Sequence, residues 1–135
     1  FVWTVDSDYQ NLQEYTKSLI QFRKDCPVFR IADAKKVSSS ASLIEVEDEV
    51  YGGEKQLVFA YSIKDGKKTW VILINADNKK NKFKVGEISK YGVKYIICAD
   101  KNSVTKDGIE NPVGVEVQEN YVILDSLTAT VICIQ

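Results

Sequence analysis

The chain has 135 residues, with 18 basic and 19 acidic side chains and a formal net charge of −1. This length fits one domain that can bury its own core. The balanced charge argues against a nucleic-acid-binding protein, because such proteins need a positive field. No run of about 18 apolar residues is present, so we expect no membrane span. Because the chain has no methionine and no signal peptide, we expect it to be part of a longer protein.

The first predicted element is a helix that begins near residues 6–8 and ends before Pro27, which cannot continue it. Its apolar side chains recur at helical spacing and form one stripe: Tyr9, Leu12, Tyr15, Leu19 and Phe22, with Ile20 beside them. A stripe of this kind has to be buried against another surface.

For residues 29–31 we predict either a short strand or a docking segment. The next stretch is polar and rich in serine, which predicts a connector with one helical turn at residues 33–37. We therefore divide the chain into a helical segment (1–31), a connector (32–42) and a β domain (43–135).

Strand-like patterns follow one another from residue 43 onward, with turn residues between them. The predicted strands cover residues 43–50, 57–64, 69–76, 82–85, 94–99, 114–118, 121–124 and 128–134. Tight turns are expected at Asp65-Gly66 and at Glu119-Asn120. No crossover helix separates the strands, so the predicted fold is mainly β: an antiparallel, Greek-key-like β-sandwich of about eight strands, preceded by one α-helix.

Catalytic motifs are missing from the chain. It contains no histidine, which excludes Ser-His-Asp and Cys-His catalysis, and it has no glycine-rich phosphate loop. The three cysteines form no CxxC pair, so we predict no metal site and no cofactor. We favour free, buried thiols for Cys98 and Cys133, and a bridge between them stays open.

Charged and aromatic side chains offer weaker candidates. Glutamates 45, 47 and 49 share one strand face, which favours a solvated sheet edge over a glycosidase pair, and lysines 79, 80 and 82 are interpreted in the same way. Trp70 lies within an apolar run and is assigned to the core. Because sugars stack on exposed aromatic rings, Trp3, Tyr51 and Tyr91 are the weak candidates for sugar contact.

The stretch YTKSLIQFRKDCPVFR at residues 15–30 resembles the late segment of bacterial type I pullulanases, which belong to the α-amylase superfamily of glycoside hydrolases. In that family a YxKxLIxLRKxxPxFR-type stretch forms the last helix of the catalytic barrel and its exit. Here Phe22 replaces the usual leucine, and Cys26 stands where a histidine is common. Residues 57–61, 70–76 and 126–132 are similar to strands of the family's C-terminal β-sandwich.

The resemblance implies a non-catalytic C-terminal accessory domain, because the family's catalytic motifs lie upstream and none occurs here. It implies that Leu12, Tyr15, Leu19 and Phe22 face the catalytic barrel, which would be the partner, and that the domain stabilises that barrel. The parent would be an extracytoplasmic glycoside hydrolase acting on α-1,6 linkages of α-glucans. Two alternatives stay open: a carbohydrate-binding module for starch, pullulan or glycogen, and an unrelated immunoglobulin-like interaction domain.

Overall fold

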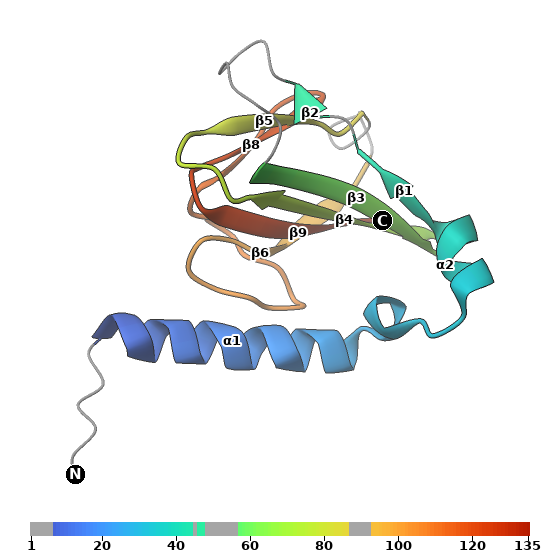
Figure 1. The fold of residues 1–135 in the computed structure, drawn as a ribbon, viewed down its shortest axis with the longest axis horizontal. Coiled ribbons are helices and arrows are strands. Elements are labelled where there is room, and N and C mark those ends of the chain that lie inside the picture. The colour runs from blue at the N-terminus through green and yellow to red at the C-terminus, as the bar shows by residue number, and fades with distance from the viewer. Residues whose placement is uncertain (1–6, 45, 48–56, 87–92) are drawn as a thin grey trace.

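Two antiparallel sheets stack face to face, and a long helix lies outside one of them (Figure 1). The computed structural model describes residues 7–44, 46, 47, 57–86 and 93–135. Its five-stranded sheet has the order β1-β3-β4-β9-β6, and its four-stranded sheet has the order β2-β5-β8-β7. The predicted β-sandwich with an N-terminal helix is confirmed.

The elements follow one another in the order helix, short helices, strands. They are α1 (Ser7–Asp25), the 3₁₀ helix η1 (Pro27–Arg30), α2 (Ala34–Ser40), β1 (Ala41–Leu43), β2 (Val46–Glu47), β3 (Val58–Asp65), β4 (Lys68–Asn75), β5 (Asn81–Lys84), β6 (Tyr95–Ala99), β7 (Val115–Val117), β8 (Tyr121–Leu124) and β9 (Thr128–Ile134). The bounds of β8 and β9 match the predicted ones, and β3 to β7 differ from the prediction by one residue at one or both ends.

The predicted strand at residues 43–50 is wrong as a single element. Its first part belongs to β1, which pairs with β3, whereas β2 pairs with β5 in the other sheet. The chain therefore changes sheets between residues 43 and 46. Alternating side chains cannot reveal such a change, because they mark a strand but not its neighbour.

The segment after α1 forms η1 and not a strand. Pro27 occupies its first turn, where the missing N–H group costs nothing. The expected helical turn in the connector is the longer helix α2, whose N-cap is Asp33. The Asp33 side chain accepts a hydrogen bond from the Lys35 N–H at 2.9 Å and a longer one from Lys36.

Both predicted hairpins are present. In the first, which joins β3 to β4, the two loop residues are Gly66 and Lys67, one position later than expected, and Gly66 has φ +61°. Such a loop places glycine first, because only glycine adopts positive φ at little cost. In the second hairpin the backbones of Gln118 and Tyr121 exchange hydrogen bonds around Glu119-Asn120.

The apolar side chains form two separate cores. One core lies between the sheets and includes Val71, Leu73, Phe83, Ile97, Val122, Leu124 and Ile132. The other lies between the outer face of the five-stranded sheet and the helical segment, and includes Phe22, Cys26, Val28, Trp70, Ile72, Cys98, Val104 and Cys133. The five-stranded sheet is thus covered on both faces along part of its length, and β4 lies at its centre.

Candidate functional site

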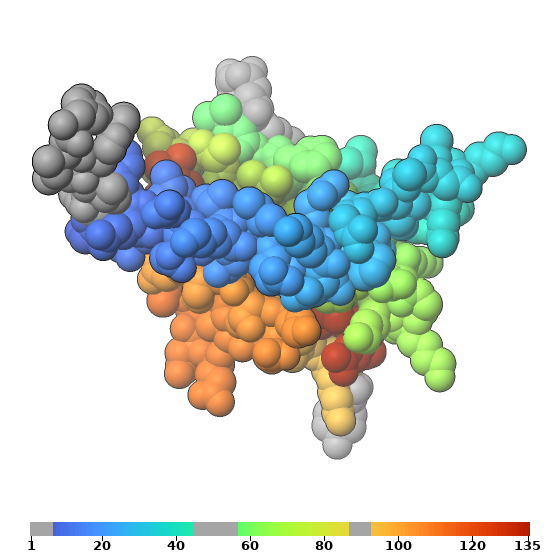
Figure 2. All heavy atoms as spheres, turned by 90° about the horizontal axis from the view of Figure 1, so that it is seen from below, coloured from blue at the N-terminus to red at the C-terminus, as the bar shows by residue number. Residues whose placement is uncertain are grey.

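Helix α1 divides its apolar stripe between two surroundings. Phe22 is only 5% exposed and packs on the sandwich, and Tyr15, two turns earlier on the same side of the helix, is half-buried. By contrast, Leu12 is 62% and Leu19 44% exposed. At about 100° per residue, the two leucines lie on the flank next to the buried side of the helix. The predicted barrel-facing set is therefore split, and only its leucines offer free surface. Figure 2 shows α1 running as a band across one face of the molecule, with the β domain visible on both sides of it.

Three aromatic rings join the end of α1 to the sheet. The ring centroids of Phe22 and Trp70 are 5.7 Å apart, those of Phe29 and Trp70 are 5.4 Å apart, and both pairs meet edge to face. Phe22 and Phe29 also touch each other at 5.6 Å. Edge-to-face contact is a favoured geometry for buried rings. This cluster holds the helical segment against β4, which confirms the assignment of Trp70 to the core.

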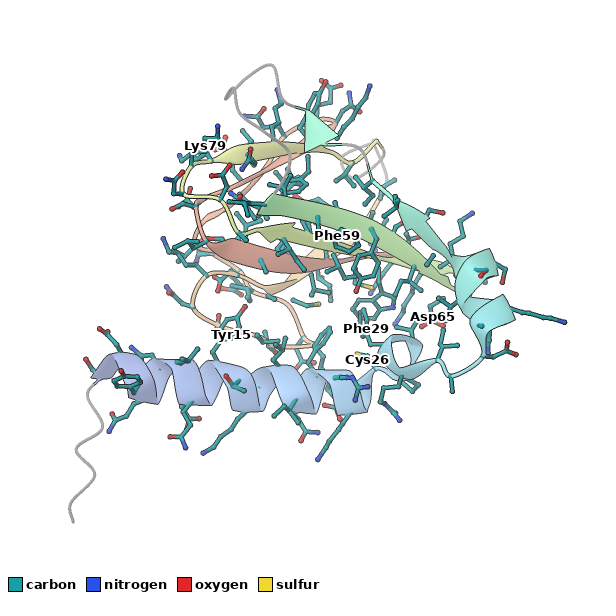
Figure 3. The ribbon with its side chains drawn as sticks, in the orientation of Figure 1. Tyr15, Cys26, Phe29, Phe59, Asp65 and Lys79 are labelled. Carbon is teal, nitrogen blue, oxygen red and sulfur yellow. The ribbon has the colours of Figure 1, made fainter. Side chains whose placement is uncertain are left out.

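Tyr15 joins the middle of α1 to the end of β6 (Figure 3). Its hydroxyl group donates a hydrogen bond of 3.0 Å to the backbone carbonyl of Asp100. Burial, assisted by the Asp100 carboxylate, raises the pKa of the Tyr15 hydroxyl, which therefore stays protonated and can donate. The contact links residues 85 positions apart in the chain.

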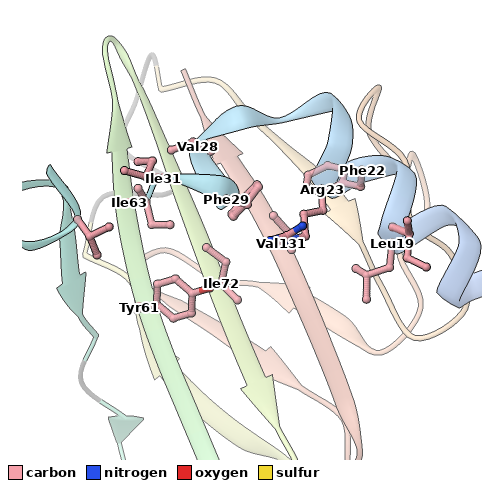
Figure 4. A pocket seen from close by; sticks show the side chains of 12 residues that line it. Leu19, Phe22, Arg23, Val28, Phe29, Ile31, Tyr61, Ile63, Ile72 and Val131 are labelled. Atoms are coloured by element: carbon pink, nitrogen blue, oxygen red, sulfur yellow. The ribbon is translucent and has the colours of Figure 1, made fainter. Parts of the chain in front are cut away.

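A groove opens beside these contacts, between α1 on one side and α2 on the other (Figure 4). It has a volume of about 500 Å³. Its floor consists of Tyr61, Ile72 and Val131 from β3, β4 and β9, and Leu19 and Val37 lie on its two walls. Burial raises the pKa of the Tyr61 hydroxyl, as an apolar surrounding does.

The apolar surface continues over the part of the five-stranded sheet that α1 leaves uncovered. Leu43 is 78% exposed, and Phe59 and Ile74 are exposed as well. Leu43 pairs with Tyr61 across β1 and β3, and the rings of Phe59 and Tyr61 are 5.5 Å apart, so the patch adjoins the groove. We call the exposed flank of α1, the groove and this patch together the docking surface, and a continuous apolar area of this kind is typical of an interaction site.

A network of hydrogen bonds fixes the end of the sandwich at which β4 and β8 end and β5 begins. The side chain of the buried Asn75 donates to the carbonyls of Lys79, Leu124 and Asp125, at 2.9, 3.2 and 2.9 Å, and accepts from the Asn81 amide at 2.8 Å. It thereby ties the ends of β4, β5 and β8 together. The role is structural, because these partners already use the polar atoms of Asn75.

Sequence reasoning missed one residue with an unusual backbone. Leu127, just before β9, has φ +51° and is 73% exposed. Leucine carries no signal for a left-handed conformation, which glycine or asparagine adopts more readily. The only sequence hint was its place directly after Ser126 in a turn between two strands.

The candidates for sugar contact and the glutamate row fall largely on undescribed positions. The structure does not describe Trp3, Tyr51, Tyr91, Glu45 and Glu49, so sugar contact stays a prediction.

The predicted lysine cluster is partly paired. The Lys80 amine lies 3.6 Å from the Asp125 carboxylate, and the Lys82 amine lies 4.0 Å from the ring centre of Tyr121.

The three cysteines are free and buried in the second core. Burial, with the nearby Cys133 and Cys26 sulfurs, raises the pKa of the Cys98 thiol to about 12. Within the described ranges, no group of histidine, cysteine or acidic side chains could hold a metal ion. None of the helices in the described part is long and apolar enough to cross a membrane.

Comparison with known proteins identifies the sandwich. Residues 41–135 match the family model described as SpuA C-terminal. The chain is 29% identical over 139 aligned residues to Pullulanase A of Streptococcus pneumoniae, an alignment that covers 98% of this chain but only 11% of that protein.

Solved structures agree with this match. The catalytic module of the pneumococcal glycogen-degrading virulence factor SpuA, in complex with an inhibitor, has a TM-score of 0.83 and 29% identity, covering 100% of this chain and 20% of that one. The Group B Streptococcus pullulanase SAP also has a TM-score of 0.83 and 29% identity, covering 100% of this chain and 18% of that one. The chain therefore belongs to the SpuA C-terminal family and is a C-terminal domain of pullulanase-like enzymes.

Proposed function

We propose that the chain is a non-catalytic accessory domain that docks on the catalytic barrel of an α-glucan-debranching glycoside hydrolase and stabilises it. The proposal rests on one observation, namely that helix α1 has two apolar sides and only one of them is covered. One side of the helix packs on the sandwich through Phe22 and Tyr15, while the neighbouring flank presents Leu12 and Leu19 to solvent. A helix with two apolar sides is suited to lie between two bodies.

The relatives are much longer than this chain, which supports the presence of a further domain on which it can dock. The chain spans about one-tenth of the length of the pneumococcal pullulanase and one-fifth of the SpuA catalytic module that it matches. Catalytic chemistry of the whole protein, including hydrolysis of α-1,6 linkages, belongs in our proposal to the part outside this domain. The absence of histidine from the whole sequence fits this division of labour.

The energetics favour docking through the flank of α1. Burying a leucine fully is worth about 1.5–3 kcal/mol. Leu12 and Leu19 lie two turns apart on the same flank, and Leu19 also borders the groove, so one apolar partner surface can cover both. The resulting free energy would stabilise the barrel and the sandwich together.

A charge introduced on this flank tests the proposal. We expect the double variant Leu12→Asp/Leu19→Asp, made in the full-length protein, to lower the unfolding temperature of the catalytic part by roughly 5 °C or more, because each carboxylate would have to be buried. Differential scanning calorimetry measures this temperature.

Gln10→Asp is the matched control. Gln10 is exposed and, at about 100° per residue, lies on the side of α1 opposite Leu19. It should leave the unfolding temperature unchanged. If the double variant and the control unfold at the same temperature as the wild type, the flank does not contact the catalytic part and the proposal fails.

A further inference from the structure

Leu127 combines a left-handed backbone with an exposed apolar side chain, and the fold of this chain explains the backbone but not the choice of leucine. It is the only non-glycine residue with positive φ in the part of the chain that the structure describes, and its side chain is 73% exposed. In the left-handed conformation Cβ comes close to the following carbonyl oxygen, so any residue other than glycine is strained. The exposed side chain makes too little contact within the domain to offset this strain.

The backbone at this point does need the left-handed residue. The chain passes from β8 in the four-stranded sheet to β9 in the five-stranded sheet within residues 125–127. The Leu127 N–H group donates to the Asp77 carbonyl at 3.1 Å, and the Asp125 N–H group donates to the Gly114 carbonyl at 2.9 Å. These bonds fix the turn, and glycine would satisfy it with less strain. The leucine side chain must therefore have another use.

The position of Leu127 indicates that use. Leu127 and Leu12 line the same hollow of about 560 Å³, between α1 and the start of β9. A body that covers the exposed flank of α1 at Leu12 therefore also reaches Leu127. The turn extends the docking surface at the end opposite the groove.

We propose that Leu127 is a second anchor that inserts into an apolar surface of the catalytic part of the same protein. This inference rests on the proposed function, because it uses the same partner. The matched part of the SpuA catalytic module is one-fifth of that chain, which leaves a body about four times larger to cover this surface. Leucine offers neither hydrogen bonds nor an aromatic face, so a protein surface suits it better than a sugar.

Reaction of single cysteines with a maleimide tests the inference directly. The variants are Leu127→Cys, Leu12→Cys and, as the matched control, Tyr95→Cys, which lies at the opposite end of the sheet, where Tyr95 pairs with Ile134. The natural cysteines are buried, and peptide mass mapping separates each site. The reaction rate is compared between the 135-residue chain and the full-length protein that carries it.

We expect position 127 to react at least tenfold more slowly in the full-length protein, and position 95 to react equally fast in both. If position 12 is protected but position 127 is not, the inference is wrong and the proposed function stands. If neither position is protected, the inference and the proposed function are both wrong. Protection at 127 that appears in the 135-residue chain as its concentration rises, or on addition of maltotetraose, would also overturn the inference, since the cover would then be a second copy or a glucan.

A pair of substitutions provides an independent test. Leu127→Gly relieves the backbone strain, and we expect a two- to tenfold larger folding equilibrium constant for the 135-residue chain, whereas Leu127→Ala keeps the strain and should give no gain. In the full-length protein both variants should lower the unfolding temperature of the catalytic part, because both remove the anchor. If Leu127→Gly raises stability in both settings, the leucine has no partner and the inference is excluded.

Discussion

Asp100 fixes the loop between β6 and β7 through both of its carboxylate oxygens. One oxygen accepts hydrogen bonds from the N–H groups of Asn102 and Ser103, each at 2.8 Å, and the other accepts from the N–H group of Val113 at 2.8 Å. The side chain is 2% exposed. Since the Asp100 carbonyl also accepts from Tyr15, this residue orders both the loop and the contact with α1.

We expect Asp100→Asn to destabilise the domain by about 1–3 kcal/mol, because the amide group would turn a donor toward a backbone N–H group. Urea unfolding followed by circular dichroism measures the loss. Asn102→Ala is the control, since Asn102 takes part through its backbone N–H group, which the variant keeps. Equal stability of Asp100→Asn and the wild type would contradict the assigned role.

The same residue predicts a pH dependence. Burial raises the pKa of the Asp100 carboxyl group, but the hydrogen bonds from Val113, Asn102 and Ser103 outweigh burial and lower it overall. A lowered pKa in the folded state stabilises the protein above the unfolded-state value of about 3.9, and this contribution is lost as the pH falls below it. The wild type should therefore lose more stability than Asp100→Asn between pH 5 and pH 3. Parallel urea titrations at those pH values would show it.

The buried thiols should be inert in the folded protein. A pKa of about 12 for Cys98 leaves about one ten-thousandth of it as thiolate at pH 8, and the thiolate is the reactive form. Ellman's reagent should therefore detect no rapidly reacting thiol in the native 135-residue chain and three in denaturant. Rapid reaction of a native thiol would show that the second core is open.

At the scale of elements, the aromatic cluster decides whether α1 stays on the sandwich. Phe22 contacts both Phe29 and Trp70, whereas the neighbouring flank of α1 contacts solvent. We expect Phe22→Ala to cost about 3 kcal/mol or more and to release the helical segment. Limited proteolysis near residue 26 and the tryptophan emission report this release.

Leu19→Ala is the matched control for that prediction. Leu19 lies on the same helix but is 44% exposed, so its truncation should cost much less in the 135-residue chain. If the two variants lose equal stability, the helix is not held mainly through its aromatic end.

Much of the β-structure was predictable, because strands leave a local signal. The alternating run of β3 and the apolar run of β4 gave their positions, and Gly66 gave the turn between them. The site was less predictable. The stripe of α1 was visible, but the sequence does not say that Tyr15 and Phe22 turn to the sandwich, because Asp100 and Trp70 are distant in the chain. The turn at Leu127 could be predicted but its positive φ could not, since this conformation arises where the chain crosses between the sheets.

At the scale of the whole molecule, the two cores should differ in stability. The core between the sheets joins strands that are hydrogen-bonded to one another, whereas the second core holds α1 against the sheet mainly through side chains. Regions with fewer buried contacts open first. We expect amide hydrogen exchange in α1 to occur through local opening, at a lower free energy than exchange in β4 and β9.

Hydrogen exchange in the full-length protein completes this prediction. If the barrel covers α1, the amides of α1 should become at least tenfold better protected there, while those of β4 should change little. Unchanged protection of α1 would contradict docking through this helix. Faster exchange of β4 than of α1 in the 135-residue chain would contradict the proposed order of the two cores.

The central position of β4 also affects how the sequence can change over evolutionary time. From Trp70 to Leu73, side chains on both faces of the strand are buried, one face in each core. Most strands can exchange the residues of one face freely, but this segment has no free face. A change in side-chain size on either face would disturb the core between the sheets or the packing of α1, so we expect β4 to accept fewer replacements than any other strand.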